Sequence, residues 1–469
     1  MCIFWKGRIE RSVCSGPDIF RRVSEEGERF YPTCLLRFSI CGSLLSPMVT
    51  FTDAPFTEDQ EAAYDEVYDR LARGERYTGL RGYAGTGKTY LVSRLVEQLV
   101  EEDCTVTVCA PTHKAVQVLS EELGDAPVDV QTLHSFLGLR LEPTEDGEYE
   151  LVPDEARDFA EGIVIVDEAS MIGREEWQHI EESPFWVQWL FVGDPAQLPP
   201  VNEDPSPALE VPGPTLETIH RQAADNPILE LATKIRTGAD GRFGSMFEDG
   251  EGVAVTHNRE EFLDSVLRAF DTEAFAEDAT HARMLAYRNK TVRRYNREIR
   301  TARYGADADR FVEGEWLVAT ETWLHDGVPR LTNSQEVRVK KATVDTFEAD
   351  DQSEWKVWTL KVRSPGRGLT RTAYVLHKDE RERYENELQN RRERAKEDGS
   401  KWDRFFDLRE RFARVDYAYA TTVHRAQGST FDTVFVDRRD LQACRDREER
   451  RALLYVAVTR PSRRLALLV

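Results

Sequence analysis

The stretch that decides the fold is Gly82-Tyr83-Ala84-Gly85-Thr86-Gly87-Lys88-Thr89, which carries the phosphate-binding pattern G-x-x-x-x-G-K-T. In this pattern the backbone N–H groups of a glycine-rich turn surround a polyphosphate at the N-terminus of a helix. The lysine reaches the β- and γ-phosphates, and the following hydroxyl binds Mg²⁺. We therefore expect this loop to bind ATP with Mg²⁺ through Gly82, Gly85, Thr86, Gly87, Lys88 and Thr89.

The residues on either side of this loop fit a strand before it and a helix after it. Residues 77–80 form a short run compatible with a strand, and large apolar residues recur at helical spacing over 91–100. From about 57 to 205, strand-like runs alternate with helical patterns, as in a parallel sheet with crossover helices. Residues 105–110 and 162–166 are nearly continuous apolar runs, which are typical of strands buried on both faces. These patterns predict an α/β protein.

The bulk composition restricts how this chain can contact a nucleic acid. Its 469 residues suffice for about three domains, and its formal net charge is −22. Because a strongly acidic chain is not the usual nucleic-acid binder, such contacts must come from local basic stripes. Most of the 63 basic residues are arginines. A high-salt cytoplasm would explain the acid excess, whereas a GC-rich genome would explain only the scarcity of lysine.

The sequence carries no targeting signal of the common kinds. No apolar run approaches the ~18 residues of a membrane-spanning helix, and the N-terminus lacks the pattern of a secretory signal. We therefore expect a cytoplasmic protein with no membrane partner.

The first residues differ in character from the rest. Four of the seven cysteines lie in the first 41 residues, but no C-x-x-C pair occurs among them, so their spacing does not favour a zinc site. Met48 directly precedes the organised region. We interpret residues 1–47 as an appended N-terminal extension, either disordered or not part of the native protein.

Beyond a proline-rich stretch at 195–214, a second alternating block begins. Its candidate strands are residues 283–286 and 432–436. Between them, over about 310–376, the chain has strand-like pieces without long helices, at 316–320, 336–339, 355–362 and 372–376. This arrangement predicts a small β-domain inserted into the second block.

Residues 377–412 are dense in charge and compatible with helix. Within 379–394 only Tyr384 and Leu388 form an apolar face, which is thin for a packed helix. A solvated or protruding helix is the expected structure. The aromatic residues that follow would dock it back; they are Trp402, Phe405, Phe406 and Phe412.

One segment carries a clear hairpin signal. Apolar and polar residues alternate over 139–141 and over 149–151, and Asp146-Gly147, a preferred turn dipeptide, lies between these two runs. From the residues alone, this is either a plain surface hairpin or a functional insertion.

A pair of acids follows the apolar strand at 163–166. Asp167 and Glu168 stand at its C-terminal end, where ligands bind in open α/β sheets. Asp167 is placed to hold Mg²⁺, and Glu168 is placed to polarise the water that attacks the γ-phosphate.

Five further stretches narrow the function. They are CAPTHKA at 109–115, QTLHSFLG at 131–138, FVGDPAQLPP at 191–200, ATTVHRAQGST at 420–430 and LYVAVTR at 454–460. Together with the phosphate loop they resemble the superfamily 1 helicases, in particular the 5′→3′ branch that contains the Dda and RecD-like enzymes. The resemblance covers about 57–469.

The resemblance implies roles around the nucleotide. Gln60 matches the glutamine that binds adenine, and Gln197 matches the residue that senses the γ-phosphate. Gly428 matches a backbone position at the edge of the nucleotide. Arg221 and Arg460 match two arginines that reach across the cleft, where such residues accelerate phosphoryl transfer by about 10³–10⁵. The catalytic set is thus Lys88, Glu168, Gln197, Arg221 and Arg460.

The resemblance also implies a path for single-stranded DNA, because hydroxyls and backbone amides bind phosphates without reading sequence. The residues on the first motor domain are Pro111, Thr112, His113, His134 and Ser135, and those on the second are Thr422, His424, Gln427 and Ser429. The arginine-rich segment 283–303, interleaved with Tyr287 and Tyr295, suits either a groove that follows the DNA backbone or a solvated basic helix face.

In this family a β-hairpin pin separates the duplex, and a small inserted β-barrel backs it. Residues 139–152 and 310–415 match those positions. The turn of the hairpin, residues 144–148, is acidic and lacks an aromatic wedge, which departs from the expected pin.

The complete expectation is therefore two RecA-like domains with two insertions. Motor domain 1 spans 48–205 with the hairpin at 139–152, motor domain 2 spans 206–309 and 416–469, and the β-barrel with the charged helical segment spans 310–415. The chain would move on single-stranded DNA, act at single-strand/double-strand junctions and unwind duplex in the 5′→3′ direction, with replication or repair proteins as partners.

The alternative is a translocase that remodels DNA within a repair or recombination complex without unwinding. A P-loop kinase would not explain residues 193–200, 421–430 and Arg460.

Overall fold

The structure is a computed structural model that describes residues 55–144, 146–154, 157–201, 203–218, 226–238, 243–248, 251–325, 328–349, 353–365 and 368–469. All of them belong to one unit of the chain, residues 42–469. The extension predicted at 1–47 and the candidate Arg221 lie outside the described residues.

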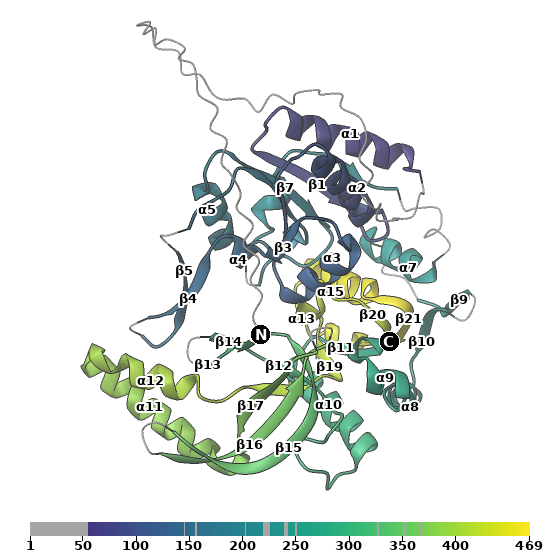
Figure 1. The fold of residues 1–469 in the computed structure, drawn as a ribbon. Helices are drawn as coiled ribbons and strands as arrows, with labels where there is room; N and C mark the ends of the chain where they lie inside the picture. Colours follow the sequence, from purple (N-terminus) through teal and green to yellow (C-terminus); the bar gives the residue numbers. More distant parts are fainter. Residues whose placement is uncertain are drawn as a thin grey trace, which may run out of the picture. The chain divides into compact units, whose positions relative to one another are not determined.

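The first α/β domain is built on a parallel six-stranded sheet with the order β3-β2-β6-β7-β1-β8 (Figure 1). The strands are β1 (Tyr77–Gly82), β2 (Val106–Ala110), β3 (Asp129–Thr132), β6 (Gly162–Val166), β7 (Val187–Gly193) and β8 (Thr215–Leu216). The helices are α1 (Glu58–Ala72), α2 (Lys88–Glu101), α3 (His113–Leu123), α4 (Leu133–Phe136) and α5 (Arg174–Glu182).

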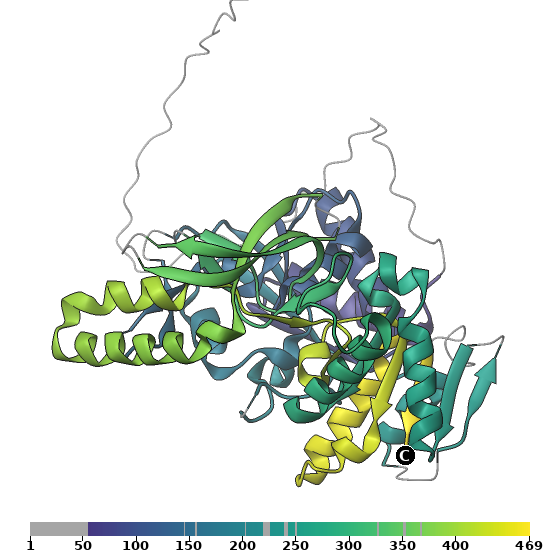
Figure 2. The ribbon, with the colours of Figure 1, turned by 90° about the horizontal axis from the view of Figure 1, so that it is seen from below.

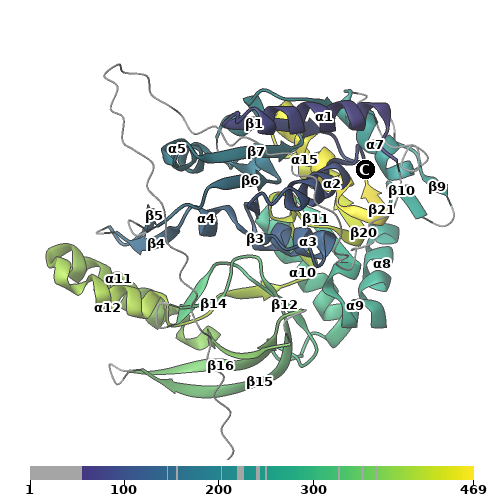
Figure 3. The ribbon, with the colours of Figure 1, turned by 45° about the horizontal axis from the view of Figure 1, so that its top comes forward.

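Both faces of this sheet are covered, which explains why its strands read as continuous apolar runs. Alternate residues of β6 take part in different cores: Ile165 packs with α1, α2 and α3, whereas Val164 and Val166 pack with Trp189 on the other face. Figure 3 shows these helices around the strands.

The second α/β domain has another six-stranded sheet, with the order β19-β11-β20-β21-β10-β9. Only the β9–β10 pairing is antiparallel. The strands are β9 (Met246–Glu248), β10 (Glu251–Thr256), β11 (Ala282–Ala286), β19 (Ala420–Thr422), β20 (Phe431–Asp437) and β21 (Pro461–Leu468). The expected α/β class with two parallel sheets is confirmed.

Helices cover this second sheet on two faces. On one face α7 (Pro227–Arg236) and α15 (Arg447–Thr459) share an apolar core with β20 and β21. On the other face α8 (Arg259–Phe270), α9 (Glu273–Glu277) and α10 (Asn289–Tyr304) pack on β11 and Phe435. Two short helices, α13 (Val423–Ala426) and α14 (Arg438–Leu441), follow β19 and β20.

An antiparallel sheet with the order β17-β16-β15-β12-β18 is inserted in the second domain. Its strands are β12 (Trp316–Ala319), β15 (Glu336–Glu348), β16 (Glu354–Arg363), β17 (Thr370–Leu376) and β18 (Val415–Tyr417). A separate pair, β13 (Trp323–His325) and β14 (Val328–Leu331), lies within the same segment. Strand β15 continues well beyond the predicted 336–339, because it pairs with β16 from Arg338 to Glu348.

The charged segment after β17 forms two helices, α11 (Arg381–Glu397) and α12 (Trp402–Arg409), which run side by side (Figure 2). Only Tyr384 and Ala395 of α11 are buried, and Leu388 is half-buried, so the expected solvated helix is present. The aromatic residues of α12 supply the packing: Trp402, Phe405 and Phe406 form a small core with Ala395.

The predicted hairpin is present as β4 (Leu139–Pro143) and β5 (Tyr149–Pro153), and its end rests on these helices (Figures 1 and 3). The Tyr149 and Phe406 rings are 5.1 Å apart, and the Tyr149 hydroxyl donates to Glu410. Arg392 donates to the Asp146 carbonyl at 2.7 Å, and Arg409 donates to the Gly147 carbonyl. Both arginines also lie 3.5 Å from the Glu148 carboxylate, so the acidic turn is docked on α11 and α12.

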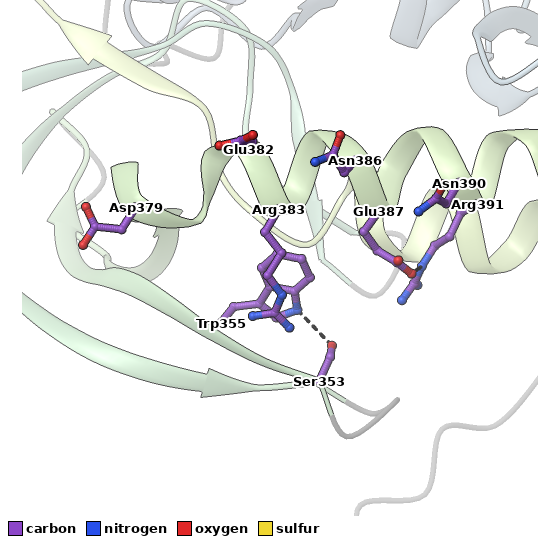
Figure 4. A pocket seen from close by; sticks show the side chains of 9 residues that line it. All are labelled: Ser353, Trp355, Asp379, Glu382, Arg383, Asn386, Glu387, Asn390 and Arg391. Carbon is purple, nitrogen blue, oxygen red and sulfur yellow. Dashed lines mark hydrogen bonds and ion pairs between the residues drawn. The ribbon is translucent and has the colours of Figure 1, made fainter.

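A hollow of about 680 Å³ opens between α11 and the start of β16, away from the phosphate loop (Figure 4). Arg383 stacks 4.2 Å from the ring centre of Trp355, whose Nε1 donates to Ser353 at 2.9 Å. Acids and amides complete the lining: Asp379, Glu382, Asn386, Glu387 and Asn390, beside Arg391.

Among the described residues, no helix combines the length and the apolar character needed to cross a membrane.

Candidate nucleotide site and strand-binding surface

The phosphate loop connects β1 to α2 at the C-terminal edge of the first sheet. Gly85 and Gly87 have φ values of +79° and +82°, in the left-handed region that glycine adopts without strain. A Cβ on Gly87 would also lie 2.3 Å from Gln60 Nε2. Lys88 Nζ donates to the Gly82 carbonyl at 2.7 Å and the Tyr83 carbonyl at 3.2 Å, so the ammonium lies over the loop.

Gln60 holds the loop from the side of α1. Its Oε1 accepts from the Thr57 backbone N–H at 3.1 Å in a capping box, and its Nε2 donates to the Thr86 carbonyl at 3.0 Å. The side chain is only 2 % exposed. Gln60 therefore lies beside the loop, where its remaining N–H and lone pair are the groups left to meet an adenine.

The two acids predicted at the end of β6 lie beside Lys88. Burial raises the pKa of Asp167, while the Glu168 backbone N–H and Lys88 oppose the rise. Burial, and after it the Asp167 carboxylate, raises the pKa of Glu168 to about 7. Arg460 and Lys88 lower it in turn, so both cations are within electrostatic reach of Glu168.

Glu168 also has an unusual backbone. Its φ of +52° lies in the left-handed region, which a non-glycine residue adopts at a cost. The Asp167 carboxylate accepts from the Glu168 N–H at 2.8 Å and stabilises this turn.

The second domain contributes the opposite side of this site. Gly428, with φ +69°, is so placed that a Cβ would lie 3.4 Å from Ala115 Cβ and about 4.0 Å from Glu168 Cγ. Arg460 is 8 % exposed, and its guanidinium donates to the carbonyls of Val456 and Ser429 at 3.2 and 3.3 Å. The structure thus brings Lys88, Glu168, Gly428 and Arg460 around one site.

Gln197 is joined to the second domain through Gln427. Gln427 Nε2 donates to Gln197 Oε1 at 3.1 Å and to Ser170 Oγ at 3.2 Å. Gln427 is 5 % exposed and Ser429 2 %. A direct DNA contact by Gln427 would require these bonds to be exchanged.

The strand-binding candidates of the first domain begin two helices. Thr112 caps α3 by accepting from the Ala115 N–H at 3.2 Å, with Pro111 half-buried before it and His113 exposed after it. Ser135 is exposed at the short helix α4, whereas His134 Nε2 lies 3.0 Å from Glu176 of α5. The first-domain candidates thus lie at or near the surface.

Those of the second domain are more enclosed. Thr422 is 9 % exposed and caps α13 by accepting from the Arg425 N–H at 3.3 Å. His424 is half-buried, 6.1 Å from the Tyr287 ring, and burial lowers its pKa. A neutral His424 offers a hydrogen bond but no charge to a phosphate.

A hollow of about 200 Å³ adjoins Thr422. Arg293 and Asn289 of α10 and Arg425 of α13 line it on the basic side, and Thr320 and Asp416 line the other side. This hollow places two cations next to a predicted strand contact.

Comparisons with known proteins agree with these features. Residues 55–258 match the AAA domain family, and residues 417–468 match the UvrD-like helicase C-terminal domain family. The ATP-dependent DNA helicase dda of Enterobacteria phage T4 is 28% identical over 454 residues, covering 88% of this chain and 98% of that protein. The ATP-dependent RecD2 DNA helicase of Deinococcus radiodurans is 36% identical over 185 residues, covering 38% of this chain and 24% of that protein.

The chain belongs to the superfamily 1 helicases of the Dda, RecD and Pif1 group. A solved structure of Pif1 helicases on forked duplex DNA has a TM-score of 0.46 and 16% identity, covering 89% of this chain and 92% of that one.

The expectation for segment 283–303 holds only in part. Arg288, Lys290, Arg293 and Arg297 are exposed, as on a solvated basic face, whereas Arg283 and Arg300 are buried against Glu336 and Glu315. Tyr295 is 1 % exposed and donates to Asp437 at 2.9 Å, so it stacks on nothing outside the core. Tyr287 is half-buried. The arginines have acidic partners that lie far away in sequence, which no local pattern reveals.

Sequence reasoning also missed residues that contact the candidate site. The Tyr455 hydroxyl bonds to the Ala84 N–H of the phosphate loop and to Asp194, and Arg425 lines the hollow beside Thr422. The signal for Tyr455 and Asp194 was present, because both lie in stretches whose neighbours Arg460 and Gln197 had been singled out.

Proposed function

We propose that this chain hydrolyses ATP to move along single-stranded DNA in the 5′→3′ direction and to separate duplex ahead of it. The observation that carries the proposal is that two α/β domains meet at the phosphate loop: the Tyr455 hydroxyl of the second domain accepts from the Ala84 N–H at 2.9 Å, and a Cβ on Gly428 would lie about 4.0 Å from Glu168 Cγ. A site divided between two domains changes its geometry when they move, so hydrolysis and domain motion are coupled.

The roles at the nucleotide follow from chemistry. Lys88 and the loop amides bind the phosphates, Glu168 accepts a proton from the attacking water, and Arg460 stabilises charge on the transferred phosphoryl group. Gln197 senses the γ-phosphate, and Arg221 is a second arginine of this kind. Gln60 meets the adenine.

A magnesium ion fits the residues that are present. The Asp167 carboxylate and the Thr89 hydroxyl are hard oxygen donors, and Mg²⁺ in such sites keeps one or two protein ligands together with phosphate oxygens and waters. When bound, the ion would neutralise charge that builds up on the phosphates.

The strand would lie on the surfaces that Pro111, Thr112, His113, His134 and Ser135 form on the first domain. On the second domain Thr422 and His424 are the candidates, with Gln427 and Ser429 acting from inside the interface. Such hydroxyl, imidazole and backbone groups bind phosphates without reading sequence, as a translocating enzyme requires.

The duplex would be parted by the β4–β5 hairpin, which α11 and α12 hold in place. The inserted antiparallel sheet, with β13 and β14, is proposed to form the small barrel that backs this hairpin. Because the tip of the hairpin is acidic and lacks an aromatic wedge, a translocase that remodels DNA without unwinding is the second candidate, and replication or repair proteins are the proposed partners of either.

Replacement of Lys88 tests the proposed chemistry. Lys88→Ala should lower DNA-stimulated ATP hydrolysis by about 10²-fold or more, because an electrostatic donor at the reacting phosphates is lost. Lys356→Ala is the matched control, since Lys356 is exposed and pairs with Asp379 on the inserted sheet. DNA-stimulated hydrolysis that persists in Lys88→Ala would defeat the mechanism.

A further inference from the structure

Tyr455 connects the second domain to the phosphate loop. It lies on α15, is 1 % exposed, and its hydroxyl accepts from the Ala84 backbone N–H at 2.9 Å. The same hydroxyl donates to Asp194 Oδ2 at 2.7 Å. One oxygen therefore bridges a helix of the second domain to two segments of the first.

The first half of the phosphate loop rests on the second domain around this bridge. The Arg236 guanidinium of α7 lies 3.7 Å from the centre of the Tyr83 ring. A Cβ on Gly85 would lie 2.7 Å from Leu229 Cδ1. Residues 83–85 are therefore positioned by α7 and α15, whereas Lys88 and Thr89 belong to helix α2 of the first domain.

Asp194 connects the Tyr455 hydroxyl to the turn that carries Gln197. Its Oδ1 accepts from the Ala196 N–H at 2.9 Å, and its carbonyl accepts from the Gln197 N–H at 3.2 Å. Asp194 is 1 % exposed, so its carboxylate depends on the Ala196 N–H and on the Tyr455 hydroxyl. The turn that carries Gln197 is therefore tied to the same hydroxyl.

The other end of this connection is Arg460. Arg460 follows the last residue of α15 and donates from Nε to the Val456 carbonyl at 3.2 Å. A rigid helix thus joins the hydroxyl that touches the loop to the guanidinium whose charge acts on the buried Glu168 carboxylate.

We propose that Tyr455 is a positioning residue that sets Arg460 and Gln197 against the nucleotide when the two domains close. The proposal rests on the proposed ATP hydrolysis at this site. Tyr455 itself touches neither the reacting phosphate nor the base. Its hydroxyl fixes the distance between the loop and α15, so its removal should slow the DNA-stimulated hydrolysis of ATP that occurs when the two domains close. Binding of ATP should be retained, because Lys88, Thr89 and the loop amides still bind the phosphates.

The variant Tyr455→Phe removes the hydroxyl and keeps the ring. We expect the DNA-stimulated kcat for ATP hydrolysis to fall about tenfold, which corresponds to the loss of one hydrogen bond to a charged group. The KM for ATP and the affinity for ADP should stay within about twofold of the wild-type values, because the phosphate contacts remain.

The matched control is Tyr419→Phe. Tyr419 is also fully buried in the second domain, where its ring packs in the core around β11, and its hydroxyl donates to the Glu315 carboxylate at 2.9 Å. Both variants lose one bond between a hydroxyl and a buried carboxylate, and Tyr455→Phe also loses the bond from the Ala84 N–H. Tyr419→Phe should lower the Tm by a comparable amount and leave kcat within about twofold.

A double-mutant cycle tests whether the loss of kcat in Tyr455→Phe acts through Asp194. Asp194→Asn keeps an oxygen for the Ala196 N–H but places an N–H₂ group opposite the Tyr455 hydroxyl, so the Tyr455 O–H loses its acceptor. If Tyr455 acts through Asp194, the losses in kcat of the two single variants will not multiply in the double variant.

Two results would overturn the proposal: a DNA-stimulated kcat of Tyr455→Phe within about twofold of wild type, or equal losses of kcat in Tyr455→Phe and Tyr419→Phe. Strand displacement by the wild type is measured in the same series. A wild type that hydrolyses ATP but parts no duplex overturns the proposed unwinding, and the kcat of Tyr455→Phe still decides the role of Tyr455.

Discussion

At the scale of single residues, the contact between the first domain and the inserted sheet depends on one buried acid. Glu336 of β15 lies 3.3 Å from Lys114 Nζ of α3 and 2.6 Å from Arg283 of β11. Burial raises the pKa of Glu336, but Arg283 and Lys114 outweigh burial and hold it below its ordinary value. Three segments far apart in sequence are thereby held by one carboxylate.

Glu336→Gln should destabilise the protein by about 3 kcal/mol or more, because two buried cations are left beside each other without their anion. Unfolding followed by circular dichroism checks this through a lower Tm. Asp69→Asn is the matched control, since Asp69 pairs with Arg73 on the exposed face of α1 and such pairs contribute little. Equal Tm losses in the two variants would contradict the assignment.

The contribution of Glu336 to the stability of the fold should also depend on pH, and the same variant measures it. Because the folded pKa of Glu336 is depressed, its stabilisation is complete above the unfolded value of about 4.3 and is lost as the pH falls through the folded value. The difference in Tm between wild type and Glu336→Gln should thus be constant from about pH 8 to 5 and should narrow below about pH 4.3. A difference that closes near neutral pH would show that another group is responsible.

The residues of the phosphate loop could be located from sequence because their chemistry is local. Gly85, Gly87 and Lys88 are fixed by their spacing, and the acids of 167–168 follow a strand that ends at the same edge. Gln427 and Ser429 could not be placed in this way, because Gln427 is bonded to Gln197 and Ser170 of the opposite domain and the Ser429 carbonyl accepts from Arg460, 31 residues later. Their roles toward DNA, like the other site roles, stay predictions.

At the scale of elements, the hairpin β4–β5 is coupled to α12 more closely than its surface position suggests. Arg409 donates to the Gly147 carbonyl, lies 3.5 Å from Glu148 and stacks 4.8 Å from the Tyr149 ring centre. One arginine therefore contacts both the turn and the strand that follows it.

Arg409→Ala should slow displacement of a 5′-tailed duplex by about fivefold or more, because a loss of about 1 kcal/mol in docking leaves the hairpin loose. ATP hydrolysis on single-stranded DNA should stay within about twofold, since the hairpin lies outside the nucleotide site. Arg404→Ala, an exposed arginine of the same helix, should change neither rate. An equal loss of both activities in Arg409→Ala would contradict a separate role for the hairpin.

The elements that sequence predicted well are those with one dominant signal. The strands β2 and β6 are continuous apolar runs, and the Asp146-Gly147 turn fixed the hairpin. The far half of β15 was missed because Lys340, Lys341 and Asp345 interrupt the apolar pattern, and only pairing with β16 makes it a strand. Likewise, the docking of the acidic turn depends on Arg392 and Arg409, which are about 250 residues away in sequence.

At the scale of the whole molecule, the charge distribution restricts which contacts can bind DNA. A chain with a net charge of −22 repels a polyanion at long range, so binding must depend on short-range contacts along the strand. Many of its arginines are unavailable for this, because Arg283, Arg300 and Arg409 already have internal partners. Arg293, exposed in the hollow beside Thr422, is the cation best placed to meet a phosphate, whereas Arg425 of the same hollow already donates to the Thr320 carbonyl at 3.3 Å.

The central claim is that ATP hydrolysis between the two α/β domains drives movement in one direction along a DNA strand. Displacement of a labelled strand from duplexes with a 5′ tail or a 3′ tail, with ATP and Mg²⁺, tests it most directly. The account predicts displacement from the 5′-tailed DNA, none from the 3′-tailed DNA and none by Lys88→Ala. Displacement from the 3′-tailed duplex alone, or vigorous DNA-stimulated hydrolysis with no displacement from either, would contradict it.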